Sequence, residues 1–118
     1  MLGKVEVMDY DREFLMGTVG VLILSLLTER EMYAYEMLQE ADRRSAQALQ
    51  LKEGTLYPAL HQMERAGWLK ARWRESASGR PRKYYALTSK GRRCAASKRR
   101  QWASISTAMR AILGDGHA

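Results

Sequence analysis

Apolar residues recur at intervals of three and four along much of this chain, which is the spacing of one face of a helix. The first such run covers residues 14–26, and a second covers about residues 33–45. Thr28 and Glu31, in the polar segment between the runs, have the spacing of a capping box. The pattern predicts two helices joined by a short polar connector.

A third helix is predicted by apolar side chains at positions i, i+4 and i+7 over residues 56–63. Gly67 follows it and supplies the left-handed stop that is common just past a helix end. Pro58 restricts where this helix begins, because proline lacks the N–H that a later helical position donates. The helix is therefore expected to begin near residues 52–55, and Thr55 as its N-cap would put Pro58 in the first turn.

Beyond the third helix the spacing changes from helical to alternating. Leu69, Ala71 and Trp73 alternate with basic residues, which predicts a half-buried strand in which Trp73 packs against the helices. Residues 76–81 have the composition of a loop, and residues 82–87 favour a second strand. The two strands are expected to form a hairpin.

Two adjacent tyrosines on the second strand must point to opposite faces, because strand side chains alternate. Tyr85 has the same parity as Leu87 and is expected to point into the core. Tyr84 is therefore expected to face outward.

The last predicted element is a helix over residues 88–113, about 39 Å long at 1.5 Å per residue. Thr88 is a favourable N-cap for it. Apolar positions along this helix alternate between spacings of three and four, which is typical of the a/d seam between two packed helices. The residues assigned to this dimerisation seam are Ala95, Trp102, Ile105, Met109 and Ile112.

These elements divide the chain into an N-terminal extension (residues 1–13), three helices with a hairpin (14–87), the long helix (88–113) and a tail (114–118). Helix, helix, helix, hairpin is the order of a winged helix-turn-helix, whose third helix enters the DNA major groove. We predict a mainly α, α+β fold of this kind with a long C-terminal dimerisation helix.

The net charge of +7 is unevenly distributed. Residues 1–50 carry five basic and nine acidic residues, a net charge of −4, whereas residues 51–118 carry fifteen and four, a net charge of +11. Like charges crowded on the hairpin repel one another, which favours an anionic partner such as a phosphate backbone. The six hairpin cations are Lys70, Arg72, Arg74, Arg80, Arg82 and Lys83.

The polar face of the third predicted helix, taken alone, is more typical of an ordinary solvated helix than of a base-reading one, because any surface helix has polar residues opposite its apolar stripe. Arginine, glutamine and histidine side chains hydrogen-bond to base edges, and hydroxyl groups suit phosphates. The neighbouring basic hairpin favours DNA. The predicted DNA-binding residues are Thr55, Tyr57, Pro58, His61, Gln62, Arg65, Arg80, Arg82, Lys83 and Tyr84.

Four short motifs, taken together in their order and separation, are more specific for a protein family than any one of them alone. They are MYAYE at residues 32–36, GTLYPAL at 54–60, ERAGWL at 64–69 and GRPRKYYALT at 79–88. Together they closely resemble the PadR family of bacterial transcriptional regulators, over roughly residues 14–113. Ala34 departs from this family, which often has glycine there, and Lys52 stands where a serine cap is common.

The resemblance implies a homodimeric repressor of the compact subgroup, with a single C-terminal helix. Its operator in double-stranded DNA would be an inverted repeat with half-sites about 34–36 Å apart, or a multiple of that distance. Family members respond to phenolic acids or flat lipophilic drugs, and tryptophans of the C-terminal helix line the drug site. The residues that match a small aromatic effector are Phe14, Leu15, Met16 and Trp102. The alternative for Trp102 is packing across the dimer.

Other chemistries have little support in the sequence. Two histidines and one cysteine provide no ligand pair at metal spacing, so we expect no metal, no cofactor and no enzymatic activity. Cys94 lies near several cations and is either a redox-sensitive thiol or, as we expect, a small buried apolar residue. No apolar run approaches the roughly 20 residues of a membrane span, and no signal peptide is evident, so we expect a cytoplasmic protein without membrane contact.

Two rival functions stay open. The first is an architectural or RNA-binding protein that uses the same basic surface without sequence preference. The second is a protein-interaction module whose basic hairpin is incidental. A steep salt dependence would distinguish the nucleic-acid binders from the interaction module. Neither the operator nor the choice between repression and activation follows from the sequence.

Overall fold

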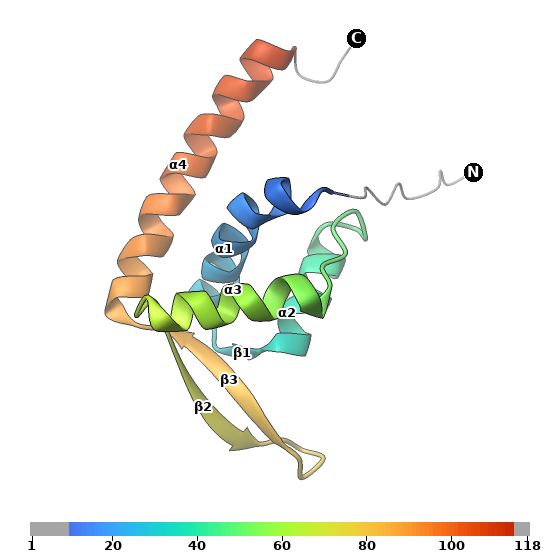
Figure 1. Cartoon of the computed structure of the whole chain (residues 1–118), viewed down its shortest axis with the longest axis vertical. Coiled ribbons are helices and arrows are strands. Elements are labelled where there is room, and N and C mark those ends of the chain that lie inside the picture. Colours follow the sequence, from blue (N-terminus) through green and yellow to red (C-terminus); the bar gives the residue numbers. More distant parts are fainter. Residues whose placement is uncertain (1–9, 115–118) are drawn as a thin grey trace, which may run out of the picture.

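The computed structural model describes residues 10–114, so most of the predicted N-terminal extension and tail lie outside the described residues. The elements follow in the order α1 (Arg12–Glu29), β1 (Met32–Tyr33), α2 (Ala34–Arg44), α3 (Glu53–Arg65), β2 (Leu69–Glu75), β3 (Pro81–Leu87) and α4 (Ser89–Leu113). In Figure 1 the hairpin of β2 and β3 extends below the first three helices, and α4 rises away from it. The predicted winged-helix fold of the mainly helical α+β class is confirmed.

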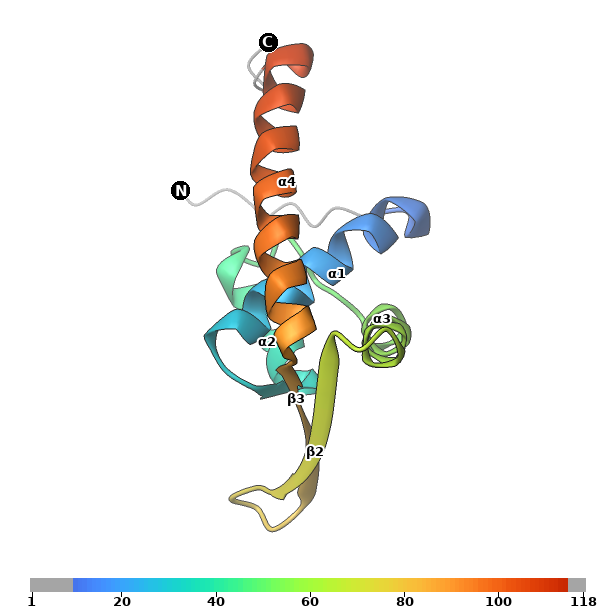
Figure 2. The same ribbon diagram turned by 90° about the vertical axis from the view of Figure 1, so that its left-hand side faces the viewer.

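The core lies where the first three helices meet the base of the hairpin. Ile23 of α1, Met37 of α2 and Leu60 of α3 are completely buried, and Tyr85 of β3 packs with them. These are apolar positions that the helical and alternating spacings predicted. The first turns of α1 do not join this core. They project beyond the other helices (Figure 2), and Phe14 is 61% exposed.

The capping box predicted at Thr28 and Glu31 is wrong. The Thr28 hydroxyl donates to the carbonyl of Leu24 at 2.8 Å, within α1. The N-cap of α2 is Tyr33, whose backbone N–H donates to the Glu36 carboxylate at 3.2 Å. An acidic side chain does close the start of α2, but five residues later in the chain than Thr28 and Glu31 suggested.

The helix α3 begins within the predicted range of residues 52–55, but Thr55 is not its N-cap. Lys52 is the N-cap and makes no side-chain capping bond, which agrees with its departure from the serine of the resembling family. Thr55 is the third helical residue, and Pro58 therefore lies in the second turn instead of the first. Because proline has no N–H, the carbonyl of the exposed Gly54 receives no helical hydrogen bond from it.

The hairpin belongs to a three-stranded antiparallel sheet in the order β1-β3-β2. Met32 and Tyr33 form the short β1 and pair with Tyr85 and Tyr84 of β3. The sequence did not predict β1, because two residues are too few to show an alternation.

Only the base of the hairpin is buried. Leu69 and Leu87 are each 3% exposed, whereas Trp73 is 68% exposed. The predicted packing of Trp73 against the helices is therefore wrong. The hairpin extends below the helices (Figure 1), so a residue with the parity of the core face is not covered along its whole length.

Both adjacent tyrosines are buried, so the prediction that Tyr84 faces outward into solvent is also wrong. Tyr84 does point to the face opposite Tyr85, but β1 adds Tyr33 there, edge-on, with ring centroids 5.3 Å apart. The guanidinium of Arg74 lies 3.9 Å from the centroid of the Tyr84 ring.

The helix α4 begins and ends where the sequence predicted. The Thr88 hydroxyl oxygen accepts the backbone N–H of Gly91 at 3.0 Å, and Gly114 ends the helix in the left-handed region, at φ 85°. Gly91 is buried against the start of β2: a Cβ there would lie 2.0 Å from the carbonyl oxygen of Trp68.

Of the helices described, none is long and apolar enough to span a membrane.

We expect Gly91→Ala to lower the free energy of unfolding by about 1–3 kcal/mol, because the new methyl group must displace backbone. Urea unfolding followed by circular dichroism measures the change. Gly54→Ala is the matched control, since no heavy atom lies within 4 Å of its Cβ position, and its stability should be unchanged or slightly higher. Equal stability of the two variants would contradict the close approach.

Candidate nucleic-acid interface

One face of α3 is exposed and carries most of the side chains predicted to read bases. The opposite face is buried through Leu56, Leu60 and Met63, which pins the orientation of the helix about its axis. Thr55 is only half-exposed and lies at the edge of the outer face. The predicted residues that the structure brings together on the outer face are Tyr57, Pro58, His61, Gln62 and Arg65.

The pairing of β2 with β3 gives the hairpin two distinct faces. One, which we call the helix-side face, carries residues 69, 71 and 73 of β2 and residues 83, 85 and 87 of β3. Its inner part packs into the core, and at its outer part the Lys83 ammonium lies 3.6 Å from the Glu64 carboxylate of α3. The helix-side face is therefore continuous with the region beside α3.

The other face, which we call the tyrosine–arginine face, carries residues 70, 72 and 74 of β2, residues 82, 84 and 86 of β3, and Tyr33 of β1. Glu31 precedes β1 and binds both arginines of β2: Arg72 donates to its carboxylate at 2.8 Å, and Arg74 donates to the same oxygen. Hydrogen bonds from Arg72, followed by the charges of both arginines, lower the pKa of Glu31 below its ordinary value.

Arg82 also has a partner on the tyrosine–arginine face. Its guanidinium donates to the Tyr33 hydroxyl at 2.7 Å and lies 4.5 Å from the centroid of that ring. This partner of Arg82 is a neutral hydroxyl, so within the described residues its charge stays uncompensated. The expectation that all six hairpin cations need an external anion is wrong for Arg72 and Arg74, which share the Glu31 carboxylate. Sequence reasoning missed this because Glu31 lies about forty residues before the arginines that it binds.

The tip of the hairpin presents Arg80. Ser76 fixes the loop, because its backbone N–H and its hydroxyl both donate to the Arg80 carbonyl, at 3.0 and 2.8 Å. Gly79 adopts φ 82°, a left-handed conformation that suits glycine in this tight loop. Within the described part of the chain, Arg80 and Lys70 are exposed and form no ion pair.

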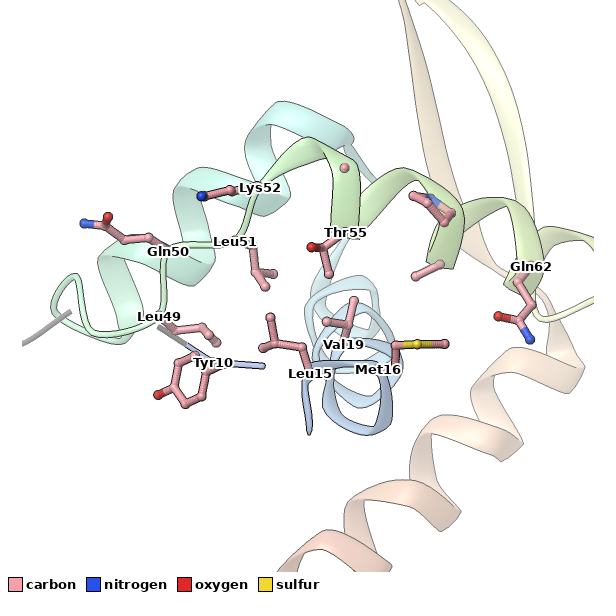
Figure 3. Close-up of a pocket in the computed structure, with 13 residues that line it drawn as sticks. Tyr10, Leu15, Met16, Val19, Leu49, Gln50, Leu51, Lys52, Thr55 and Gln62 are labelled. Atoms are coloured by element: carbon pink, nitrogen blue, oxygen red, sulfur yellow. The ribbon is translucent and has the colours of Figure 1, made fainter. Parts of the chain in front are cut away.

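The residues predicted for an effector do not come together within one chain. Leu15 and Met16 line a pocket of about 780 Å³ between α1, the segment before α3, and α3 itself (Figure 3). Trp102 lines a different, more open pocket of about 650 Å³, which it shares with Val21. Phe14 stacks instead on Tyr10, with centroids 6.0 Å apart.

Sequence reasoning also missed several residues of the larger pocket. Figure 3 shows Leu49 and Leu51 on the same side of the pocket as Leu15. They belong to an irregular segment in which Ala46 and Gln47 have positive φ angles, 52° and 69°. A segment without a periodic pattern offers no signal from which its side-chain directions can be predicted.

The predicted seam of α4 is exposed over most of its length. Ala95 is partly buried against the core, but the large apolar residues beyond it are uncovered by the described part of the chain. The exposed fractions are 48% for Trp102, 50% for Ile105, 41% for Met109 and 75% for Ile112. Such a contiguous apolar stripe is typical of an interface.

Two remaining expectations concern reactive groups. Cys94 is partly buried and packs against the core, in keeping with the expected apolar role. Over residues 10–114, no three histidine, cysteine, aspartate or glutamate side chains cluster as a metal site would require.

A three-helix core, an exposed third helix and an antiparallel hairpin define a winged helix-turn-helix protein. Comparison with known proteins identifies the family. The chain matches the model of the PadR-like family of transcriptional regulators over residues 23–97. It is 32% identical over 103 residues to the transcriptional regulator Rv3488 of Mycobacterium tuberculosis, covering 87% of this chain and 90% of that protein.

Solved structures agree with this assignment. A PadR family transcription regulator from Clostridium difficile is 36% identical, with a TM-score of 0.69, covering 82% of this chain and 99% of that one. A PadR-like regulator from Bacillus cereus is 27% identical, with a TM-score of 0.74, covering 86% and 96%. The chain therefore belongs to the PadR-like family of DNA-binding transcriptional regulators, which are not enzymes, and the resemblance drawn from its motifs is confirmed.

Proposed function

We propose that this protein is a dimeric repressor that binds an inverted-repeat operator in double-stranded DNA through α3 and the hairpin. The observation that carries the proposal is the shared exposure of His61, Gln62 and Arg65 on the outer face of α3. Their ring, amide and guanidinium groups match the donors and acceptors of base edges in the major groove. Tyr57 and Pro58 extend this contact region, and Thr55 borders it.

Phosphate contacts would come from the hairpin tip. Arg80 is exposed and unpaired within the described chain, and Lys83 is held only by a loose ion pair with Glu64. The hydrogen bond of Arg82 to the Tyr33 hydroxyl orients its guanidinium and leaves its positive charge and its other donors for a phosphate. Tyr84 is buried and does not belong to the proposed contact set.

Base-reading and phosphate-binding residues should respond differently to substitution. Arg65→Ala is expected to reduce discrimination between the operator and a scrambled duplex by about 1–3 kcal/mol, because a base contact is lost. Arg80→Ala is expected to weaken both duplexes alike and to lower the salt slope by about 1. Fluorescence anisotropy at several salt concentrations measures both effects, on a duplex that the wild-type protein selects from a random library.

The same measurement decides between the proposal and its rival. Equal loss of affinity for every duplex in both variants would contradict sequence-specific reading and favour an architectural or RNA-binding role.

The proposed dimer forms through the exposed seam of α4. Supporting it, four large apolar side chains repeat at the spacing of a two-helix seam, and the described part of their own chain leaves them uncovered. A second copy supplies an identical stripe, which twofold symmetry would set against the first. The two α3 helices would then meet half-sites about 34–36 Å apart, or a multiple of that distance.

Met109→Asp is expected to dissociate the dimer, because it buries a charge in the seam. Sedimentation equilibrium should show a monomer at concentrations where the wild-type protein is dimeric. Thr107→Asp is the matched control, since it places the same charge on the exposed opposite side of α4 and should leave the mass unchanged. A wild-type monomer at every concentration would contradict the proposed dimer.

We further propose that a small aromatic or lipophilic effector releases the repressor from DNA. In support, Trp102 lines a pocket of about 650 Å³, a volume within the usual range for small ligands. In the proposed dimer, Phe14, Leu15 and Met16 of the second copy would approach Trp102. The proposed place of action is the cytoplasm, where bacterial DNA lies.

A planar aromatic effector from a compound panel is expected to weaken operator binding by about 5- to 150-fold, the usual range of coupling between two sites. Trp102→Phe keeps an aromatic ring in the seam but should reduce this coupling, whereas Trp68→Phe should not. Anisotropy titrations with and without each compound provide the measurement. If no compound of the panel changes operator affinity, Trp102 has only the packing role.

A further inference from the structure

Trp73 is a large apolar residue on a hairpin that is otherwise mostly cationic beyond its base. Its side chain is 68% exposed, so packing within the chain does not account for it. Substantial exposed aromatic surface in a basic region is typical of a binding surface, because an aromatic ring contributes apolar contact and the indole N–H donates a hydrogen bond.

The strand register decides which way Trp73 points. It pairs directly with Lys83 across the hairpin, and both lie on the helix-side face. One pair closer to the core, Ala71 and Tyr85 of the same face are covered by the helices. Trp73 is thus the first residue of β2 on this face that extends past the helices, on the side where Lys83 approaches α3 through Glu64.

The cations on the two faces of the hairpin differ in the partners that they have within the chain. On the tyrosine–arginine face, Glu31 pairs with Arg72 and Arg74, and Arg82 donates to the Tyr33 hydroxyl. On the helix-side face and at the tip, Lys83 is loosely paired and Arg80 is exposed. Lys83 and Arg80 therefore lie beside Trp73, on the side of the hairpin that is continuous with α3, whereas Lys70 lies nearer the core on the opposite face. Figure 2 shows the hairpin extending below the level of α3 and to one side of it.

We propose that the helix-side face of the hairpin is the side that meets duplex DNA, with the Trp73 indole packed against the deoxyribose of the backbone next to the groove that α3 enters. Lys83 binds an adjacent phosphate, and the indole N–H donates to a backbone oxygen. Sugar and phosphate contacts of this kind position a protein on DNA without reading sequence. The inference rests on the proposed function, since it requires duplex binding through α3.

An apolar contact and a cationic contact leave different signatures in salt titrations. Trp73→Ala removes contact area but no charge, so it releases no counterion. Affinity for the library-selected duplex should fall roughly 5- to 30-fold at every salt concentration, the equivalent of 1–2 kcal/mol, with an unchanged slope of log K against log salt. Arg72→Gln is the matched control: the neighbouring residue on the opposite face should change affinity less than about twofold.

Tryptophan fluorescence provides a second readout. Addition of the selected duplex should change the emission of the wild-type protein, and Trp73→Phe should lose most of that change while Trp68→Phe keeps it. Because Trp73 is exposed, its variants should unfold in urea at the wild-type midpoint, which separates lost binding from lost folding.

The outcomes separate this inference from the function on which it rests. Wild-type affinity in Trp73→Ala, together with an unchanged fluorescence response in Trp73→Phe, would overturn the inference and leave operator binding standing. A stronger effect of Arg72→Gln than of Trp73→Ala would overturn it too, since DNA would then meet the other face. Failure of the wild-type protein to bind any duplex would overturn both proposals.

Discussion

The arrangement of the molecule depends on one junction, at Thr88. Its backbone N–H donates to the Trp68 carbonyl at 3.0 Å, and its hydroxyl donates to the Gly67 carbonyl at 2.6 Å and accepts the N–H of Gly91. One residue therefore closes the base of the hairpin, holds the end of α3 and caps α4. Gly91 permits the close approach, because any larger side chain would collide with the Trp68 carbonyl. Lys90 adds a further link, donating to the Ala66 carbonyl at 2.9 Å.

Because of this junction, α3, which is proposed to read the bases, and α4, which is proposed to form the dimer, cannot move independently where they meet at Thr88. Thr88 hydrogen-bonds to Gly67 just after the end of α3 and caps the start of α4, so the direction of α4 is set relative to α3. In the proposed dimer, the angle between two α4 helices would fix the distance between two α3 helices, and hence the half-site spacing. A ligand that altered the seam at Trp102 would act on DNA affinity through this geometry and would need no contact with α3.

The positions of the charged side chains change what the net charge implies about a partner. The basic half of the chain suggested a large anionic partner, yet part of its charge is neutralised by Glu31, which belongs to the acidic half. The interaction orders one face of the hairpin: Arg74 lies over Tyr84, Tyr84 packs on Tyr33, and Arg82 binds the Tyr33 hydroxyl. These arginines are structural in the free protein. The cations left for a partner are fewer than the composition suggested: Arg80 lies at the tip, Lys83 on the helix-side face, and Lys70 and Arg82 on the other face.

The sequence alone determined the four helices, the hairpin, the Thr88 cap and the outer face of α3, because these follow from local periodicity and from residues within one turn of each other. Parity along a strand correctly set Tyr84 and Tyr85 on opposite faces but did not reveal what covers each face. Only the tertiary structure placed β1 beside β3, which buried Tyr84, and extended the hairpin past the helices, which exposed Trp73. Whether a side chain is covered depends on residues far away in the chain, and local patterns carry no record of those contacts.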